Sequence, residues 1–557
     1  MPKVTSRSLL TALLLATAAP AIAAPDAVYL HGKIWTGDDD GRFVQALAVE
    51  DGRIVAVGDD KTVAALADSA TRRVDLAGRL VTPGFIDNHT HFLQASLALS
   101  AVDLRDAASP AEFTRRIGQR AKGKPGEWIL EGNWDHELWN GVLPTRDWID
   151  AVTGATPVFV RRLDGHMGLA NSAALKLAGI GATTADPPGG TIVRDAMGKP
   201  TGLLKDTAMD AVFRILPAPD DAQVDAALQR GFQEALSHGV TQIHDMSDGD
   251  WRTLDALRRA QAQGRLLIRA YAFVPIADWE KLAAFIRKNG RGDSWLRWGG
   301  VKGFVDGSLG STTAWFYRPY DDAPQTSGLT MADPAILASQ IQAADRAGLQ
   351  VAVHAIGDRA NDWLLDTYQR ITREDGAKDR RFRIEHAQHL SPAAIGRFST
   401  LGVIPSMQPY HAIDDGRWAE KRIGAERLKG TYAFHSLLAA GAPLTFGSDW
   451  PVAPLDPLTG IDAAVTRRTI DGRHPNGWQP QERVTVAQSV RAYTNANAFA
   501  GFQDKQAGRI APGMLADFVI LSDDVFTITP ARISSVRVLR TIINGKEGYV
   551  APNLPRN

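Results

Sequence analysis

The sequence predicts an α/β protein: a (β/α)8 TIM barrel with a small β-sandwich formed from both chain ends and an insertion after the first barrel strand. Apolar strand-like runs alternate with amphipathic helical stretches through the middle of the chain, and both ends are rich in short strands. Eight runs follow one another, which is the number that closes a barrel. They are Leu80–Ile86, Gly239–Ile243, Leu266–Phe273, Val301–Val305, Leu349–Val353, Arg381–Ile384, Gly402–Pro405 and Pro443–Phe446.

The predicted organisation follows from the length of the chain and from these runs. A chain of 557 residues exceeds what one ordinary hydrophobic core supports, so several folding units are expected. They are a signal peptide over 1–23, the first part of the β-sandwich over 24–82, the barrel over 83–500 with its insertion at about 104–205, and the second part of the β-sandwich over 501–557.

The first residues have the pattern of a secretory signal peptide. Lys3 and Arg7 precede the apolar run Leu9–Leu15, and Ala21-Ile22-Ala23 matches the small-residue cleavage pattern. The run is short for a membrane span, and no other long apolar segment follows it. We therefore expect an exported protein, most simply periplasmic, without membrane contact after the peptide is removed.

The segments on either side of the barrel consist of short strands and tight turns, a pattern typical of hairpins. Because the two ends are alike and differ from the middle, we expect them to pair into one small sandwich with a structural role. The strands expected in it are Ala27–Leu30, Ala46–Val49, Arg53–Val57, Asp517–Leu521 and Ser535–Ile543.

The insertion accounts for the long gap between the first and second barrel runs. It contains strand-like stretches of its own, Glu127–Leu130 and Pro157–Val160. Two polar stretches in it, Asn133–His136 and Arg162–Ser172, suit a functional role better than simple packing.

Composition excludes several classes of protein. Lys and Arg number 62, as do Asp and Glu, so the net charge of zero gives no support for a nucleic-acid partner or an anionic membrane partner. The chain has no Cys, which excludes disulfides and a lipid-modified cysteine. The partner we expect is a small-molecule substrate; a homodimer is compatible with the pattern, but nothing in the sequence determines the oligomeric state.

The stretch Pro83–His91 carries the first chemical signal. His89 and His91 lie two residues apart at the end of an apolar run, so on a strand their side chains share a face. Two imidazoles that converge in this way form a chelate for a transition metal. Taken alone, the pair also fits a solvated loop, so the residues at the other strand ends are needed to distinguish a metal site from a loop.

Those strand ends are consistently polar. His244-Asp245 ends the second run, Lys302 lies on the fourth, and His354 and His386 end the fifth and sixth. Asp449 follows the eighth. In a barrel, the carboxyl ends of the strands meet at one mouth, so these side chains are expected to gather there.

Five of these stretches resemble the amidohydrolase superfamily of metal-dependent hydrolases, and most closely the branch that includes N-substituted formamide deformylase. The resemblance spans nearly the whole chain after the signal peptide. The stretches that carry it are Pro83–His91, Val301–Ser308, Val353–Asp358, Arg383–Gln388 and Phe446–Pro451.

The resemblance implies a site for one or two divalent metal ions, zinc being the usual ion. His89, His91 and Asp449 would bind one ion, and His354 and His386 the second. Lys302, carboxylated on its side-chain amine, would bridge the two ions. A lysine held in an ordinary salt bridge is the alternative for Lys302, and a helix cap is the alternative for Asp449.

The expected reaction is hydrolysis of a carbon–nitrogen bond in a non-peptide amide by a hydroxide that bridges the metals. Asp449 would accept the proton of the water and pass it to the departing amine. His244 is expected as a second catalytic residue, either in a hydrogen bond beside the ligands or at the developing oxyanion.

The substrate is expected to be small and aromatic or apolar, because aromatic residues lie near the polar motifs. We expect Trp134, Trp315, Tyr317, Trp450 and His166 to line its pocket. His166 lies in an Asp-Gly-His segment that resembles the family segment above the active site. An esterase or lactonase on the same metal site is the nearest alternative, and a binding protein that has lost the chemistry is a more distant one.

Overall fold

The computed structural model describes residues 24–38, 40–99, 101–123, 127–217, 219–247, 249–552 and 554. Its centre is a sheet of eight parallel strands in chain order, which confirms the predicted (β/α)8 barrel. Asp449 N–H donates to His89 O over 2.7 Å, and His91 N–H to Trp450 O over 2.9 Å, so the last strand returns to the first. The strands are β8 (Phe85–Thr90), β14 (Val240–Met246), β15 (Arg269–Pro275), β16 (Leu296–Phe304), β17 (Gln350–Ala355), β18 (Arg383–His386), β19 (Ile404–Met407) and β20 (Thr445–Phe446).

The first barrel strand differs from the prediction. Leu80–Ile86 is not one strand: β7 (Leu80–Pro83) joins a sheet of the chain ends, and β8 begins at Phe85. Gly84 separates them because the chain passes close to its neighbour there. A Cβ at this position would lie 2.3 Å from Thr241 Oγ1, so only glycine allows the crossing.

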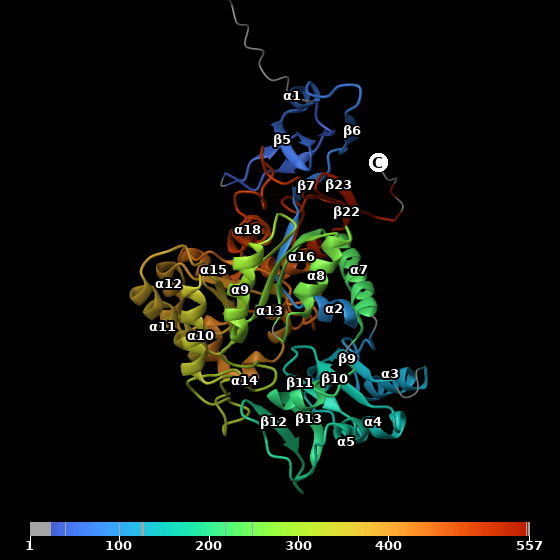
Figure 1. The fold of residues 1–557 in the computed structure, drawn as a ribbon, viewed down its shortest axis with the longest axis vertical. Helices are drawn as coiled ribbons and strands as arrows, with labels where there is room; N and C mark the ends of the chain where they lie inside the picture. The colour runs from blue at the N-terminus through green and yellow to red at the C-terminus, as the bar shows by residue number, and fades with distance from the viewer. Residues whose placement is uncertain are drawn as a thin grey trace, which may run out of the picture.

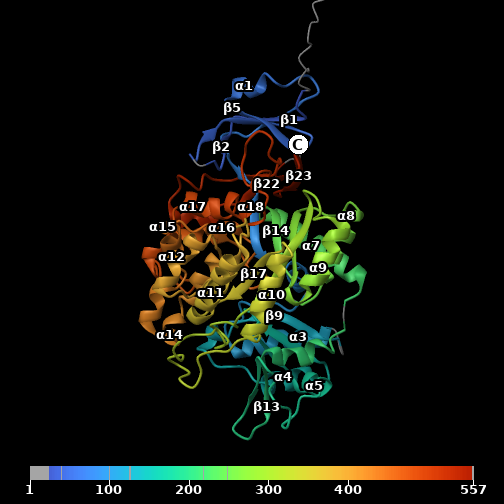
Figure 2. The same ribbon diagram turned by 60° about the vertical axis from the view of Figure 1, so that its left-hand side comes forward.

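Helices surround the barrel strands (Figures 1 and 2). Several begin at residues whose side chains cap free backbone N–H groups; Asp333 and Ser391, each followed by proline, begin α10 and α12. The helices are α2 (Phe92–Ala98), α7 (Asp221–Ser237), α8 (Arg252–Ala262), α9 (Trp279–Asn289), α10 (Pro334–Arg346), α11 (Asp358–Asp375), α12 (Pro392–Leu401), α13 (Pro409–Asp415), α14 (Ala419–Arg427, kinked at Gly424), α15 (Phe434–Ala439), α16 (Pro457–Thr466), α17 (Val486–Ala492) and α18 (Asn495–Ala500).

Two sheets from the chain ends pack together at one end of the barrel (Figures 1 and 2). They share a core in which the ring of Tyr29 meets the ring of Phe518 edge-on, with centroids 5.0 Å apart. One sheet contains β1 (Ala27–Leu30), β4 (Ala46–Glu50), β5 (Arg53–Gly58) and β6 (Arg72–Asp75), with α1 (Asp60–Ala64) beside it. The other contains β7, β2 (Lys33–Trp35), β3 (Phe43–Val44), β21 (Phe518–Leu521), β22 (Val538–Ile543) and β23 (Lys546–Val550).

The insertion lies at the opposite end of the barrel (Figures 1 and 2). It is a five-stranded sheet with its own apolar core. The sheet covers the end of the barrel at which the carboxyl ends of its strands lie. Its elements are α3 (Pro110–Gly123), β9 (Ile129–Trp134), α4 (Arg146–Thr153), β10 (Val158–Arg162), β11 (Met167–Ala170), α5 (Ser172–Leu177), β12 (Gly190–Arg194), β13 (Pro200–Asp206) and α6 (Asp210–Phe213).

The predicted signal peptide over 1–23 lies outside the described residues. Among the residues that are described, no helix combines the length and the apolar composition that crossing a membrane requires.

His238 links the end of α7 to the start of α16 through an ion-pair cluster. Its Nε2 lies 3.3 Å from Glu234 Oε1, and its Nδ1 lies 3.7 Å from Asp456 Oδ1. Burial lowers the pKa of His238, but Asp456 and Glu234 outweigh burial and raise this pKa from 6.5 to about 9. The protonated form therefore stabilises the fold fully below pH 6.5, and this contribution is lost as the pH rises through about 9.

Replacing His238 by glutamine is expected to lower the thermal unfolding midpoint at about pH 6 and to change it little at about pH 10, because the imidazole is already neutral in the folded protein at the higher pH. Circular dichroism at the two pH values measures the difference. An equal decrease at both would contradict the ion-pair explanation.

Candidate metal centre

The six predicted metal ligands converge at the carboxyl ends of the barrel strands. Their rings are close: the centroids of His354 and His386 are 4.5 Å apart, and those of His89 and His386 are 4.9 Å apart. All six are buried except His91, whose side chain is 16% exposed. They are His89 at the end of β8, His91 directly after it, Lys302 on β16, His354 on β17, His386 on β18 and Asp449 after β20.

Asp449 shows most directly that this cluster suits a metal. Its Oδ1 lies 3.4 Å from His89 Nε2 and 3.3 Å from His91 Nε2, yet among the described residues this buried oxygen has no hydrogen-bond partner. Ligand atoms of His89, His386 and Asp449 lie within 4.8 Å of one another. A buried acceptor without a partner is costly, whereas imidazole and carboxylate donors are ligands for zinc and similar ions. The residues therefore fit a divalent metal.

Three of the imidazoles, those of His89, His354 and His386, have the protonation state that metal binding requires. Burial, followed by the charge of Lys302, lowers the pKa of His89 from 6.5 to about 4. Burial also holds the pKa values of His354 and His386 well below the ordinary value. Neutral imidazoles leave lone pairs free for a cation.

Neighbouring groups orient two of these rings. His386 Nδ1 lies 2.8 Å from Gln408 Oε1, which leaves Nε2 for the cluster. His354 Nε2 lies 3.0 Å from the carbonyl oxygen of Gly307, which leaves Nδ1. Partners of this kind fix the tautomer and the direction of a metal-binding imidazole.

Glu385 orients His89. Its Oε2 lies 2.6 Å from His89 Nδ1 and accepts from Ser406 Oγ over 2.6 Å. Arg383 donates to both carboxylate oxygens, over 2.7 and 3.0 Å. Burial alone would raise the pKa of Glu385, but the guanidinium of Arg383 and the bond to His89 hold it well below its usual range. The carboxylate is therefore charged and directs His89 Nε2 toward the cluster.

Replacing Glu385 by glutamine is expected to weaken metal binding by about 10- to 100-fold, because the amide no longer fixes the tautomer of His89. Competition with a chelator measures the change. Glu482→Gln is the matched control: Glu482 is also buried, but it binds Ser436 and does not line the cavity beside the metal centre. Equal metal affinity in both variants would contradict this role for Glu385.

Lys302 lies within the same cluster. It is 2% exposed, and its Nζ lies 3.5 Å from His89 Nε2 and 4.6 Å from the centroid of the Phe304 ring. An unmodified Lys302 would place a positively charged ammonium group beside the candidate metal ligands. An anionic group at this position would bind a metal ion instead of repelling it. This position is compatible with a modified, metal-bridging lysine.

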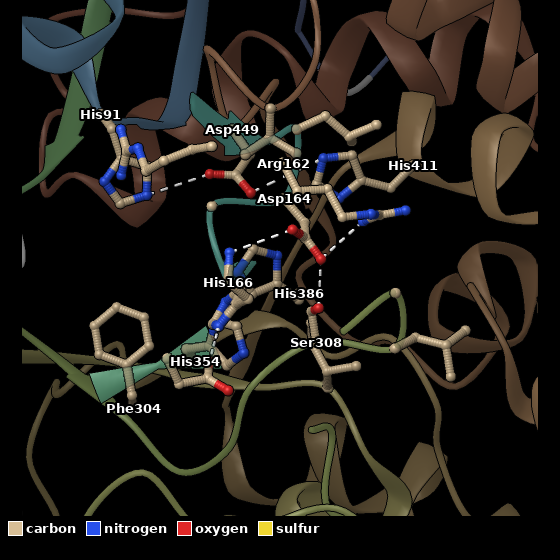
Figure 3. A pocket seen from close by; sticks show the side chains of 18 of the residues that line it. His91, Arg162, Asp164, His166, Phe304, Ser308, His354, His386, His411 and Asp449 are labelled. Carbon is tan, nitrogen blue, oxygen red and sulfur yellow. Dashed lines mark hydrogen bonds and ion pairs between the residues drawn. The ribbon is translucent and has the colours of Figure 1, made fainter. Parts of the chain in front are cut away.

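A cavity of about 420 Å³ opens onto the cluster between the barrel and the insertion (Figure 3). His91, Lys302, His354, His386 and Asp449 line its barrel side. The insertion side includes Arg162, Asp164, His166, Asp206 and Met209, so the predicted substrate-facing residue His166 does reach the cavity.

Four aromatic residues predicted to line this cavity do not, and the prediction is wrong for them. Trp134 is fully buried in the core of the insertion, where its Nε1 donates to Val160 O over 2.8 Å. Trp450 packs edge-on against Phe92, with centroids 5.5 Å apart. These large rings fill core volume in preference to facing a polar cavity.

Trp315 and Tyr317 lie outside the cavity on the loop after β16. The guanidinium of Arg359 lies 4.3 Å from the centroid of Trp315, and Tyr317 is 56% exposed. The apolar residues that do line the cavity come from other segments. They are Leu163, Met209, Phe213, Phe304, Leu309, Met331, Ile356, Trp418, Pro451 and Val452.

His244 lies behind the metal centre, not at the substrate. It is fully buried, and its Nδ1 lies 3.0 Å from Arg383 Nη1; Arg383 binds Glu385, which in turn binds His89. Burial and then the charge of Arg383 keep the pKa of His244 well below its ordinary value. Of the two roles expected for His244, a hydrogen bond behind the ligands agrees with this position. A role at the oxyanion does not, because two side chains separate His244 from the nearest candidate ligand.

Three residues of the site were not assigned to metal binding or catalysis from the sequence. Glu385 precedes His386, and a positive φ of 73° at His386 lets both of these consecutive side chains reach the centre. His411, on α13, lines the cavity, and its Nε2 lies 3.9 Å from Asp449 Oδ2 (Figure 3). Asp206 pairs with His166 across 40 residues, so no local pattern in the sequence could have indicated it.

Comparison with known proteins agrees with this geometry. The family model described as "Amidohydrolase family" matches residues 72–549. The protein LONG AFTER FAR-RED 3 of Arabidopsis thaliana is 41% identical over 545 residues, which cover 95% of this chain and 92% of that protein. N-substituted formamide deformylase of Arthrobacter pascens is 29% identical over 540 residues, covering 94% and 98%.

A solved structure has the same architecture. The crystal structure of an uncharacterized metal-dependent hydrolase from Pyrococcus horikoshii superposes with a TM-score of 0.75 at 29% identity, and the match covers 91% of this chain and 99% of that one. The fold, the converging histidines and the family match lead to one conclusion. The chain belongs to the amidohydrolase family, as a metal-dependent hydrolase of carbon–nitrogen bonds.

Proposed function

We propose that this protein hydrolyses the amide-type bond of a small, partly apolar substrate with the help of two zinc ions bridged by a carboxylated Lys302. The observation that carries the proposal is Asp449 Oδ1, a buried oxygen that lies between two imidazole nitrogens and has no hydrogen-bond partner in the part of the chain that the structure describes. Deformylase activity, which the name of the Arthrobacter relative records, is one form of such hydrolysis.

The donor atoms divide into two sets. His89, His91 and Asp449 would hold one ion, and His354 and His386 the other. A carbamate on Lys302 would supply the anionic oxygens that the cluster of imidazoles otherwise lacks. When bound, divalent cations lower the pKa of a water and polarise a carbonyl oxygen.

Asp449 is the group that moves the proton. Its Oδ2 is directed toward the cavity side, 3.9 Å from His411 Nε2, whereas Oδ1 faces His89 and His91 (Figure 3). In the proposed mechanism the Asp449 carboxylate accepts a proton from the attacking water and returns it to the departing nitrogen. One carboxylate then acts first as a base and later as an acid.

The cavity walls define the substrate class. Phe304 borders both Lys302 and His354, with the ring centroids of Phe304 and His354 5.2 Å apart. Met331, Ile356 and Trp418 continue this apolar surface. An apolar group beside the scissile bond would pack here, and a volume of about 420 Å³ suits a small molecule better than a folded protein.

A matched panel of substrates tests the proposal. N-formyl and N-acyl amines and the corresponding esters, each with the same apolar group, are assayed with enzyme loaded with zinc, treated with chelator and reloaded. We expect the enzyme to hydrolyse the amides, to lose this activity when treated with chelator, and to regain it when zinc is added back. Hydrolysis of esters alone would favour the esterase alternative, and activity indifferent to chelator would contradict the metal-dependent mechanism.

A further inference from the structure

His166 and Asp206 form a buried pair on the insertion side of the cavity. His166 Nδ1 lies 2.7 Å from Asp206 Oδ1, and the Asp206 side chain is completely buried. The His166 ring faces the metal ligands, with its centroid 5.3 Å from that of His354 (Figure 3). Since Nδ1 is bound to the carboxylate, the other ring nitrogen, Nε2, is left for the cavity that both residues line.

The backbone fixes this pair from two sides. Asp206 N–H donates to His166 O over 3.0 Å, and His166 N–H donates to Asp164 Oδ1 over 3.2 Å. Asp164 is itself held by Arg162 over 2.8 Å and by Ser308 Oγ over 2.6 Å. The imidazole is therefore tied both to the insertion and to the barrel loop after β16.

Asp206 adopts a backbone conformation that non-glycine residues rarely use, with φ 47° and ψ −127°. Strain of this kind persists only where the surroundings enforce it, and it concentrates at functional sites. The opposite loop leaves just enough room: a Cβ on Gly307 would lie 3.1 Å from Asp206 Oδ1 and 2.1 Å from Thr313 Oγ1. Backbone, loop and carboxylate thus fit one another closely.

We propose that Asp206 is a positioning residue for hydrolysis: its carboxylate accepts a hydrogen bond from His166 Nδ1–H and thereby presents His166 Nε2 to the reacting amide group of the substrate. A carboxylate bound to one ring nitrogen fixes the tautomer and orientation of an imidazole. The metal ligands and His166 line one cavity, so the reacting group lies between them. This inference rests on the proposed amide hydrolysis.

The test compares Asp206→Asn, His166→Gln and the double variant with the zinc-loaded wild type on the amide that the wild type hydrolyses. Each single variant is expected to lower kcat by at least about tenfold and to change KM by less than about threefold. The double variant is expected to be no slower than His166→Gln, because Asp206 acts only through that ring. Bound zinc and the thermal midpoint of each variant establish that the fold and the metal centre are intact.

Asp456→Asn provides the matched control, because Asp456 also pairs with a histidine, His238, but lies outside the cavity. Its kcat and KM are expected to equal those of the wild type. An unchanged kcat in Asp206→Asn, or losses that simply multiply in the double variant, would overturn this inference and leave the proposed function standing. A wild type that hydrolyses no amide would overturn the proposed function as well.

Discussion

Replacing Asp449 by asparagine is expected to lower kcat by about 10²–10⁴-fold, the contribution typical of a positioned acid or base. Asparagine keeps the shape of the side chain but can neither accept a proton from water nor return it to a leaving nitrogen. The position is constrained, because Asp449 has a φ of 63° and its N–H donates to His89 O over 2.7 Å. Asparagine tolerates this left-handed backbone, so the fold should survive.

Steady-state kinetics with a measurement of bound metal on the same sample tests this expectation. The His238→Gln variant serves as a control, since it alters a titratable group that does not line the cavity. If Asp449→Asn retained its metal and kept kcat within a few-fold of the wild type, Asp449 would not be the proton carrier.

Replacing Lys302 by alanine is expected to remove most of the activity together with the more weakly held metal ion. Lys302 lies on β16 in the middle of the cluster, 3.5 Å from His89 Nε2. Loss of the proposed carbamate would leave the proposed second ion with the two imidazoles of His354 and His386. Loss of a ligand or of its support weakens metal sites by about 10- to 100-fold or more. A small carboxylic acid added to the variant is expected to restore part of the activity by occupying the space of the missing side chain.

A second lysine, which is partly buried, provides the control. Lys205 donates to Ser311 O over 2.9 Å and does not line the cavity, so Lys205→Met is expected to keep its metal content. Full activity of Lys302→Ala without added carboxylate would contradict the bridging role.

The barrel and the convergence of the candidate metal ligands could be predicted because simple rules connect them to the sequence. Strands buried on both faces read as apolar runs, and the carboxyl ends of parallel strands share one mouth. His354, His386 and Asp449 each lie within three residues of the end of such a run, so their convergence follows from the topology. His89 and His91 are two residues apart, and side chains two residues apart on a strand lie on the same face, so both were expected to face the cluster.

The walls of the cavity could not be predicted in the same way. Trp134 and His166 belong to the same insertion, yet Trp134 is in its core and His166 faces the metal ligands. Which of the two side chains faces the cavity depends on how the five-stranded sheet of the insertion packs against the barrel. The pairing of β10 with β9 in this sheet has a register shift between Arg161 and Arg162. No local pattern contains that information. The pairing of His166 with Asp206, and the place of His244 behind Arg383, likewise depend on contacts between distant segments.

The metal content per chain, measured by elemental analysis on protein prepared with bicarbonate, tests the central claim most directly. The wild type is expected to hold about two equivalents of zinc or a similar ion, and Lys302→Ala clearly fewer, because a bridged pair of ions needs both sets of ligands and the carbamate. About one equivalent in both proteins would contradict the bridged pair, and no bound metal under any loading condition would contradict metal-dependent hydrolysis altogether.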